Sequence, residues 1–311
     1  MPDTVAGPTE FAGFARQRTL RNSVSCSGIG LHSGRAVRMS IHAAPAGSGI
    51  RFIRTDLGGD QAIIPADWRQ VCDLPLCTAL SNDAGTQVAT VEHVMAALSG
   101  CGIDNAEIAI DAPELPIMDG SAAPFLFLIE CAGMVEQPAP RRAIALLKSV
   151  VIEDSERRVA LHPATEFSVE IEVDYGTCAL TRQSYNARVT PDAFRAEIAR
   201  ARTYGFLADA ETLRAAGLAQ GASLDNAVVV SEGQVMNQGG LRYPNELARH
   251  KALDAIGDLA LAGGPLLARF EGRRSGHKLH HRLLAALFAD SEAWAWAPIR
   301  EDLPIQVSAA E

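Results

Sequence analysis

The ten residues from Arg249 to Asp258, R-H-K-A-L-D-A-I-G-D, constrain this chain most because they read as one short helical span. Residues four apart on an α-helix share a face, so His250 and Asp254 can reach one point, and Asp258 points toward the same side one turn later. A histidine and an aspartate one turn apart form a two-ligand half-site for a metal such as zinc. An isolated pair of this kind is more often a simple pair on a solvated helix face, so the rest of the chain must decide.

The size and composition of the chain indicate a two-domain globular protein. At 311 residues it exceeds the usual length of one domain and favours two domains of about 150 residues each. Hydrophobic residues make up 48% and charged residues 21%, which is the profile of a soluble protein rather than a disordered or fibrous one. The formal net charge of -9 disfavours a nucleic-acid partner, so an anionic small-molecule substrate would need a local basic patch.

Cysteine use and the N-terminal residues indicate the compartment. The six cysteines form no C-x-x-C pair, which is typical of reduced thiols that pack as small hydrophobic side chains. The first residues contain Asp3 and Glu10 and lack a basic stretch followed by an apolar run, so we expect no secretory signal. No segment reaches the ~18 apolar residues that a transmembrane segment needs. We therefore expect a cytoplasmic protein, and we expect it to be a monomer.

The order of strands, glycine turns and helices divides the chain into two similar halves. Each half reads strands, helix, strand, helix, which suggests a duplicated α+β layer pair. The segment Gln137–Arg142, with two prolines and two arginines, is the best linker. The predicted plan is a flexible N-terminal extension (1–16), a first α+β domain (17–136), the linker (137–142), a second α+β domain (143–300) and a tail (301–311).

Periodicity and end signals predict the regular elements. Apolar and polar residues alternate from Phe167 to Asp174, which predicts a half-buried strand. Thr190 and Pro191 form a cap and a first turn for a helix through Ala201. We further expect a strand at 106–110 and helices at 94–98, 125–132, 245–261 and 277–289.

A second reactive group lies at the start of the apolar helix in the first half. Thr90 is a plausible N-cap for this helix, and Glu92 and His93 then fall in its first turn, where backbone N–H groups are unpaired. That position suits a functional site better than a core. A capping glutamate beside a surface histidine is the simpler alternative for an isolated Glu-His pair.

His93 from the first half, with His250 and Asp254 from the second, could supply three ligands to one metal. Three protein ligands leave the fourth tetrahedral position open for water, which distinguishes catalytic from structural zinc. Zinc lowers the pKa of such a water to about 7. Glu92 is then the candidate base that takes the remaining proton as the water attacks a carbonyl carbon.

Further polar residues complete a candidate hydrolytic site. His277 precedes a helix and is the candidate acid for a leaving nitrogen, if Asp258 holds and charges its imidazole. Lys251 and Arg274 could supply positive charge for phosphates. His32, in a glycine-rich turn, is either a site residue or a turn histidine bonded to backbone. The residues alone thus indicate a metal-assisted hydrolase.

Five spaced motifs resemble a known family. They are T-V-E-H at 90–93, I-M-D-G-S-A-A-P-F at 117–125, A-R-T-Y-G-F at 201–206, R-H-K-A-L-D-A-I-G-D at 249–258 and S-G-H-K at 275–278. In this order they resemble the UDP-3-O-acyl-N-acetylglucosamine deacetylases, which carry out the committed step of lipid A biosynthesis. The resemblance runs from Gln17 through Trp294, nearly the whole chain.

This resemblance implies a zinc amidase, with iron(II) as the alternative metal, that removes acetate from the 2-nitrogen of a UDP-sugar bearing a 3-O-acyl chain. It implies two α+β domains, each a sheet packed on two helices in a layered sandwich, with the active site between them. An insert at about 205–234 would line an apolar passage for the acyl chain. The family's functional positions fall on the metal ligands His93, His250 and Asp254, the base Glu92, the protonating His277 with its partner Asp258, the oxyanion-holding Thr203, and the nucleotide-facing Phe206, Lys251 and Arg274.

Two other functions remain compatible with these residues. One is another zinc amidase or peptidase, which would depend neither on UDP nor on an acyl passage. The other is a non-catalytic metal-binding regulator of the same fold. Loss of Glu92 or His277 would mark such a regulator, and both residues are present.

Overall fold

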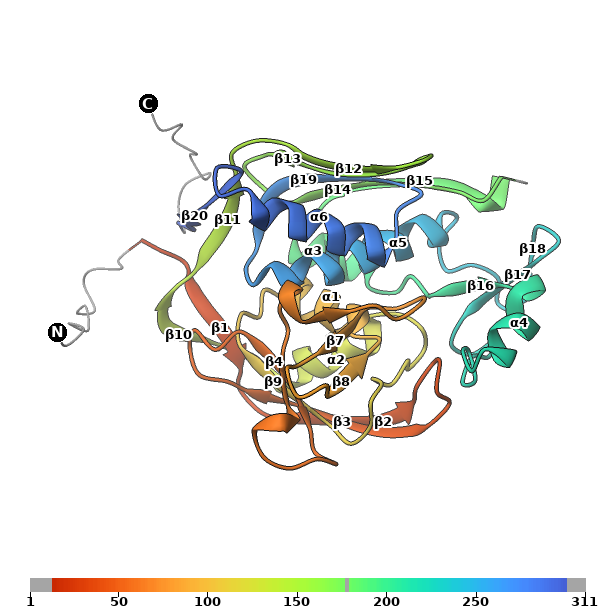
Figure 1. Cartoon of the computed structure of the whole chain (residues 1–311), viewed down its shortest axis with the longest axis horizontal. Coiled ribbons are helices and arrows are strands. Elements are labelled where there is room, and N and C mark those ends of the chain that lie inside the picture. The colour runs from red at the N-terminus through yellow and green to blue at the C-terminus, as the bar shows by residue number, and fades with distance from the viewer. Residues whose placement is uncertain (1–12, 177–178, 301–311) are drawn as a thin grey trace.

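The computed structural model describes residues 13–176 and 179–300, which form two α+β layers stacked face to face (Figure 1). One sheet lies at the top of Figure 1 and the other at the bottom, and the main helices fill the space between them. The order from top to bottom is therefore sheet, helices, helices, sheet. This arrangement confirms the predicted fold class, in which each half packs a sheet on helices.

The lower layer contains a five-stranded sheet with strand order β2-β3-β9-β4-β5. Alternate residues of β3, namely Val37, Met39 and Ile41, are buried, because period-2 side chains of a strand with one covered face point into the core. Helices α1 and α2 lie on this face (Figure 1). The elements are β1 (Arg16–Leu20), β2 (Val24–Ile29), β3 (Ala36–Ala43), β4 (Ile50–Arg54), β5 (Ile63–Pro65), β6 (Val71–Cys72), β7 (Ala79–Ser81), β8 (Gln87–Ala89), α1 (Glu92–Cys101), β9 (Ala106–Ile110), α2 (Ala123–Ala132) and β10 (Met134–Pro140).

The upper layer contains a seven-stranded sheet in which β19 pairs with β11, β13 and β14. The predicted strand at 167–174 appears as β14, and Val169, Ile171 and Val173 form its buried face. The predicted helix at 277–289 is α6 with the same bounds. The elements are β11 (Arg142–Leu146), β12 (Val150–Asp154), β13 (Arg157–Pro163), β14 (Ser168–Asp174), β15 (Arg182–Arg188), α3 (Pro191–Ala193), α5 (Glu246–Leu259), β19 (Leu266–Arg273), α6 (His277–Ala289) and β20 (Trp294–Pro298).

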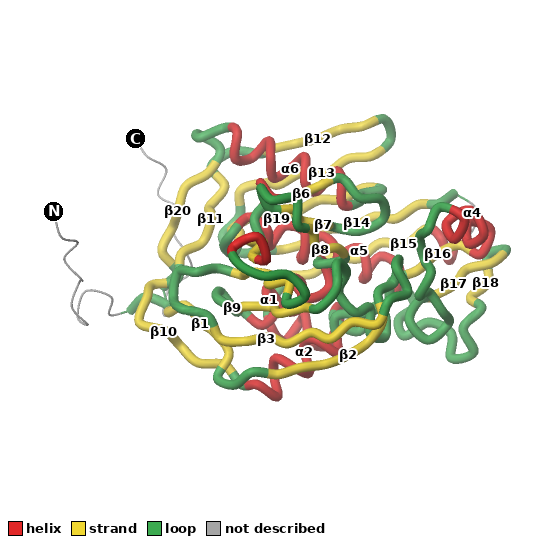
Figure 2. Tube along the Cα trace, turned by 60° about the horizontal axis from the view of Figure 1, so that its bottom comes forward, coloured by secondary structure: helices red, strands yellow, loops and turns green. Residues whose placement is uncertain are grey.

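A small unit projects from one end of the layers, at the right in both Figure 1 and Figure 2. It contains a three-stranded sheet of order β16-β17-β18 and the short helix α4. Its elements are β16 (Tyr204–Phe206), α4 (Ala210–Ala215), β17 (Val228–Ser231) and β18 (Gln234–Val235). The unit coincides with the predicted insert at 205–234.

The ends of several elements differ from the prediction. Thr90 is not the N-cap of α1: its φ is 59°, and its hydroxyl donates to Glu114 instead of capping the helix. The helix that begins at Pro191 changes after Ala193 into a π-helical turn, Phe194–Ile198. The first difference comes from the contact with Glu114, which a local pattern does not contain.

The segment 137–142 is mostly strand, because β10 runs through Pro140 and β11 begins at Arg142, with only Arg141 between them. The prolines are tolerated because β10 pairs only with β1 and thus has a free edge. The chain does pass from the lower to the upper layer here, and the position of the domain boundary stays a prediction. Of the predicted termini, 1–12 and 301–311 lie outside the described residues, whereas Phe14 pairs with Arg300 and Arg16 begins β1.

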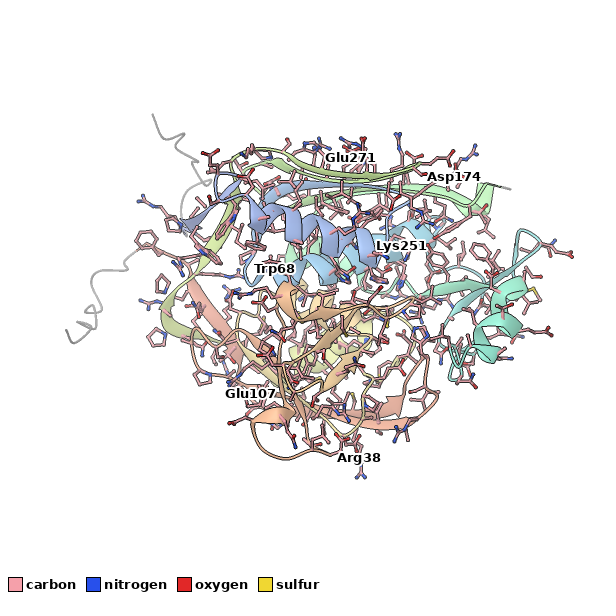
Figure 3. The ribbon with its side chains drawn as sticks, viewed as in Figure 1. Arg38, Trp68, Glu107, Asp174, Lys251 and Glu271 are labelled. Atoms are coloured by element: carbon pink, nitrogen blue, oxygen red, sulfur yellow. The ribbon has the colours of Figure 1, made fainter. Side chains whose placement is uncertain are left out.

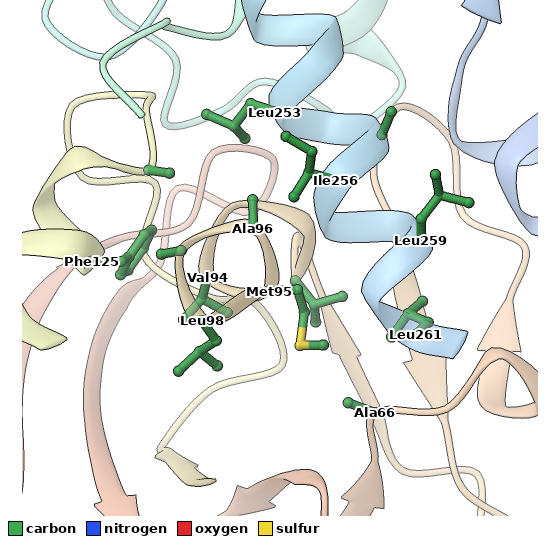
Figure 4. Packing of buried hydrophobic residues seen from close by; sticks show 14 of the residues in the cluster. Ala66, Val94, Met95, Ala96, Leu98, Phe125, Leu253, Ile256, Leu259 and Leu261 are labelled. Carbon is green, nitrogen blue, oxygen red and sulfur yellow. The ribbon is translucent and has the colours of Figure 1, made fainter. Parts of the chain in front are cut away.

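The two layers meet where α1 packs against α5 (Figure 4). Leu253 and Ile256 of α5 face α1, where Ala96 presents only a methyl group. All three side chains are at most 1% exposed. Small residues on one helix opposite branched residues on the other allow close packing of the two axes. No helix within the described part of the chain is long and apolar enough to span a membrane.

Candidate active site

The candidate site forms where α1 and α5 come closest. A Cβ built on Gly257 would lie 2.0 Å from the backbone oxygen of Glu92, so only glycine permits this approach. The first turn of α1 thereby contacts the last turn of α5. The contact brings His93 from one layer against His250 and Asp254 from the other.

His93, His250 and Asp254 form a buried group whose ligand atoms all lie within 4.8 Å of one another. Nε2 of His250 is 3.2 Å from Oδ1 of Asp254, and Nε2 of His93 is 3.8 Å from the same oxygen. Ligands bound tetrahedrally to zinc stand about 3.3 Å apart. Each residue is at most 3% exposed, and Nδ1 of His93 has no hydrogen-bond partner in the described residues. The group therefore fits a metal ion without rearrangement of the backbone.

Neighbouring hydrogen bonds leave the lone pairs of Oδ1 of Asp254 and Nε2 of His250 free to bind a metal ion. Nζ of Lys251 donates to Oδ2 of Asp254 at 2.8 Å, which leaves Oδ1 facing the imidazoles. Nδ1 of His250 lies 3.0 Å from the oxygen of Ala201, and because a carbonyl only accepts, Nδ1 carries the proton and Nε2 the lone pair. Burial, together with the nearby His250, lowers the pKa of His93 to about 3. Burial also lowers the pKa of His250, so both rings are neutral at pH 7.

Glu92 is a buried carboxyl group beside the His/Asp group. It is 3% exposed, and its Oε2 accepts the backbone N–H of Thr78 at 3.0 Å. Burial raises the pKa of Glu92 to about 8. A divalent cation held by the neighbouring ligands would favour the carboxylate form, because an opposite charge a few ångströms away stabilises it. Glu92 is thus suited to accept a proton near neutral pH.

Asp258, buried one turn further along α5, pairs with His277, a partly exposed residue at the start of α6. Oδ2 of Asp258 accepts from Nδ1 of His277 at 2.8 Å and from Nδ1 of His280 at 2.7 Å. Burial alone would lower the pKa of His277, but the Asp258 carboxylate overrides it and raises that pKa to about 9. His277 is therefore an imidazolium at pH 7 and can donate a proton.

Three residues around this pair did not stand out in the sequence: Thr78, His280 and His281. The hydroxyl of Thr78 donates to Oδ1 of Asp258 at 2.5 Å and lies 3.0 Å from Nε2 of His281. The spacing H-x-x-H-H from His277 on a helix was an available signal for the histidines, because such residues share a face. Thr78 gave no such signal, since it is 180 residues from Asp258 in the chain. The set Asp258, His277 and His280 also has metal-ligand spacing, but its atoms are hydrogen-bonded to one another.

The residues predicted to face a nucleotide lie in two neighbouring cavities. One, of about 460 Å³, is lined by Lys251, Arg274, Tyr175 and Asp174, and Figure 3 labels Lys251 and Asp174 in the same part of the molecule. The other, of about 530 Å³, is lined by apolar residues of the projecting unit, such as Phe206, Leu207 and Val230, and by the polar residues Thr181, Ser231 and Glu232. The ring centroids of Phe206 and Tyr175 are 5.1 Å apart, so these aromatic side chains join the two cavities.

Arg274 and Thr203 hold their places through several contacts. Arg274 pairs with Glu156, and its Nη2 is 3.2 Å from Oδ2 of Asp174. The N–H of Thr203 donates to Gly120 at 2.7 Å, and its carbonyl accepts from Val228 at 2.8 Å. Thr203 lies two residues after Ala201, whose carbonyl accepts the hydrogen bond from His250.

His32 lies at the rim of the site. Its backbone N–H donates to Oε1 of Glu114 at 2.7 Å, which fixes the glycine-rich turn. Burial lowers the pKa of its ring, Glu114 opposes that shift, and the charge of His277 adds to it. His32 is thus close enough to the acid–base pair to respond to its charge.

Metal-dependent hydrolases need an ion that activates water and, beside it, separate groups that accept and donate protons. The contact between the two layers brings together residues that could serve both purposes: a His/Asp group with metal-ligand spacing and, beside it, Glu92 and His277. Residues 17–289 match the model of the family described as LpxC: UDP-3-O-acyl N-acetylglycosamine deacetylase, and the chain belongs to this family. The family resemblance of the five motifs is thereby confirmed.

Relatives that carry the family's name support this assignment. The UDP-3-O-acyl-N-acetylglucosamine deacetylase of Shewanella sp. (strain W3-18-1) is 45% identical over 294 residues, which cover 94% of this chain and 96% of the relative. The protein of the same name from Chromohalobacter salexigens is 46% identical over 290 residues, covering 92% of this chain and 95% of the relative. Both matches span the two layers and the projecting unit.

Proposed function

We propose that this protein hydrolyses the N-acetyl group of UDP-3-O-acyl-N-acetylglucosamine, releasing acetate, as a zinc enzyme of lipid A biosynthesis. Its relatives carry the name of this activity. The observation that carries the proposal is the meeting of His93, His250 and Asp254 within 4.8 Å, next to the buried Glu92 and within the field of the charged His277.

His93, His250 and Asp254 would hold the metal. Two imidazole nitrogens and one carboxylate oxygen suit zinc, and the same set accepts iron(II) as the alternative. When bound, the metal supplies Lewis acidity, which lowers the pKa of a coordinated water and polarises a carbonyl oxygen. Lys251 neutralises part of the charge of Asp254, so the ligand set carries less than one full negative charge toward the ion.

The acid–base residues then move the protons. Glu92, as a carboxylate, accepts a proton from the attacking water. His277, as an imidazolium, donates a proton to the 2-nitrogen as the C–N bond breaks and acetate leaves, and Asp258 keeps the ring charged and oriented. The Thr203 hydroxyl donates to the carbonyl oxygen as negative charge develops there.

The two cavities suit the two ends of the substrate. Lys251 and Arg274 are the cations that would face the phosphates, and Phe206 offers an aromatic surface beside them. The cavity lined by Phe206, Leu207 and Val230 is apolar enough for a 3-O-acyl chain. The proposal includes a monomer that acts in the cytoplasm, which light scattering and cell fractionation would check.

Acetate release from the acylated UDP-sugar, measured together with the metal content of the purified protein, tests this function. The matched substrate is the same UDP-sugar without its 3-O-acyl chain. We expect one zinc per chain and much faster turnover of the acylated substrate. Equal rates on both substrates would favour another zinc amidase, and full activity after complete removal of metal would contradict the proposed chemistry.

Chelator-treated protein reloaded with zinc or with iron(II) identifies the working metal. Both ions should restore turnover, because both accept nitrogen and oxygen ligands, and the protein isolated from its native cell then shows which one is used. A protein with bound zinc and no turnover on any acylated UDP-sugar would support a regulator of the same fold.

A further inference from the structure

One peptide group behind the candidate metal site is held at both of its ends. The carbonyl of Ala201 accepts Nδ1–H of His250 at 3.0 Å, and the N–H of Arg202, which belongs to the same peptide unit, donates to Oε1 of Glu246 at 3.0 Å. Carbonyl and N–H point in opposite directions in a trans peptide. The unit therefore connects the Glu246 carboxylate to the ring of His250 in one line of hydrogen bonds.

Four hydrogen-bond donors fix the carboxylate of Glu246. It is 0% exposed, and besides the N–H of Arg202 it accepts from Nε of the same arginine at 2.8 Å, from its Nη2 at 3.1 Å, and from the backbone N–H of Arg242 at 2.6 Å. Glu246 lies one turn before His250 on α5, so both ends of the line start from the same helix. A carboxylate with this many fixed donors has little freedom to turn.

We propose that Glu246 is a positioning residue for metal binding, which acts on His250 through the peptide unit between Ala201 and Arg202. This inference rests on the proposed function, in which His250 is a metal ligand. The negative charge at the N–H end polarises the peptide and strengthens the hydrogen bond that its carbonyl accepts from Nδ1. A stronger bond at Nδ1 makes Nε2 a better electron-pair donor and fixes the direction of the ring.

Thr203 lies next in the chain to the peptide that this line of hydrogen bonds holds. Thr203 follows Arg202 directly, and its own N–H and carbonyl are bound by Gly120 and Val228. Fixing the peptide between Ala201 and Arg202 thus sets the start of the segment that carries the Thr203 hydroxyl. Loss of Glu246 should therefore lower kcat as well as metal affinity.

The alternative is that Arg202 and Glu246 form only a structural ion pair, since buried pairs of this kind often contribute to folding without touching the chemistry. The two residues can be separated experimentally. Only the Glu246 carboxylate contacts the peptide N–H, whereas the Arg202 side chain contacts the carboxylate and Gly240. Arg202→Met removes the side-chain bonds and keeps the bond between the backbone N–H and Glu246.

The test compares Glu246→Gln with Arg202→Met by competition for zinc against a chromophoric chelator, and thermal unfolding of the metal-free proteins reports stability. Asp104→Asn is the matched control, because Asp104 also accepts a backbone N–H, from Arg18, and an arginine Nε, from Arg141, far from the site. We expect zinc affinity to fall ~10–100-fold in Glu246→Gln and to stay near wild type in the other two variants, even where they are less stable. Wild-type affinity in folded Glu246→Gln, or an equal loss in Arg202→Met, would overturn the inference.

A measurement on the wild-type chain keeps the inference testable if Glu246→Gln fails to fold. In metal-free protein with ¹⁵N-labelled histidine, the ring of His250, assigned by its absence in His250→Gln, should carry its proton on Nδ1. A ring protonated on Nε2 would overturn the inference. Unchanged zinc binding by His250→Gln would instead contradict the proposed function, and the tautomer would still show whether the peptide holds the ring.

Discussion

Asp254 and Asp258 lie one turn apart on α5, and they hold their histidines in opposite ways. Asp254 gives one oxygen to Lys251 and turns the other toward His250 and His93 at 3.2 and 3.8 Å. Asp258 is hydrogen-bonded to two imidazoles at 2.7 and 2.8 Å. Both carboxylates are at most 2% exposed, so burial does not explain the difference.

Under the proposed function, this difference decides whether residues of the same types serve as metal ligands (the metal group, His93, His250 and Asp254) or as a proton donor with its partner (the acid group, His277 and Asp258). The ammonium of Lys251 already balances Asp254, and the imidazoles facing it stay neutral: the pKa of His93 is lowered to about 3, chiefly by burial. Asp258 has no ammonium in hydrogen-bond contact within the described chain, and it draws a proton onto His277, whose pKa rises to about 9 against the effect of burial. The two groups thus differ in two contacts: Lys251 balances the charge of Asp254, whereas Asp258 is hydrogen-bonded directly to His277.

Removing a ligand from the metal group should have the largest effect. In His250→Gln we expect zinc to be lost and acetate release to fall by at least ~1000-fold, because no ion remains to activate water. Metal analysis and turnover of the acylated UDP-sugar check this. Zinc retained at one per chain would show that His250 is not a ligand, and the contrast between the Asp254 and Asp258 groups would then not be one between metal ligands and an acid.

The base should be separable from the ligands. Glu92→Gln keeps an oxygen that can accept the N–H of Thr78, so the fold and the metal should remain while turnover falls ~100-fold or more. Plasma emission spectroscopy and kinetics on the same sample measure both. A parallel loss of zinc would show that Glu92 belongs to the metal group, and wild-type turnover would show that it is not the base.

The acid group should control the alkaline limb of the pH–rate profile. His277 acts in its protonated form, so activity should fall as pH rises through about 9. In Asp258→Asn the carboxylate that raises this pKa is gone while burial still lowers it, so the limb should move to lower pH by more than one unit, with kcat at pH 7 reduced ~10-fold. The acid limb, which we assign to Glu92 or the activated water, should not move in the same direction.

If the alkaline limb stays near pH 9 in Asp258→Asn, Asp258 does not set the pKa of the acid, and the assignment of His277 as that acid is contradicted. His280→Asn is the matched control, since it changes another hydrogen bond to the same oxygen of Asp258. It should shift the limb by less than Asp258→Asn does.

The smallest effect is expected at Thr78, which connects Asp258 of the acid group to the base Glu92. The Thr78 hydroxyl donates to Asp258, and its backbone N–H donates to Glu92. Thr78→Val removes the contacts of the hydroxyl, with Asp258 and also with His277 and His281, and keeps the backbone bond to Glu92. We expect kcat to fall a few-fold and the free energy of unfolding by about 1 kcal/mol. Thr78→Ser keeps the hydroxyl and should behave as wild type. Chemical denaturation and kinetics measure both, and equal defects in the two variants would assign the effect to packing.

Local patterns predicted much of this structure. The helix at 277–289 and the strand now seen as β14 followed from periodicity, because each has one buried face. The i, i+4 spacing on α5 placed His250 and Asp254 on one side of the helix. Their grouping with His93 was proposed from ligand chemistry and supported by the motif resemblance, since nothing in helical spacing says which helix α5 will face.

What could not be predicted depends on contacts between distant residues. Thr90 has the residue type of an N-cap, but its positive φ and its bond to Glu114 gave it another role. Thr78 and Glu246 became important only because the fold brought Asp258 and the peptide after Ala201 to them. Neither the spacing nor the composition of the chain contains that information.

The missing side chain at Gly257 allows one layer to donate His93 while the other donates His250 and Asp254. A bound ion would then cross-link the two layers, and because it binds only the folded chain, each tenfold rise in free metal above its dissociation constant would add about 1.4 kcal/mol to stability. The lifetime of the folded protein would therefore follow the zinc supply of the cell. A methyl group at this single position would weaken that link by forcing the two helices apart.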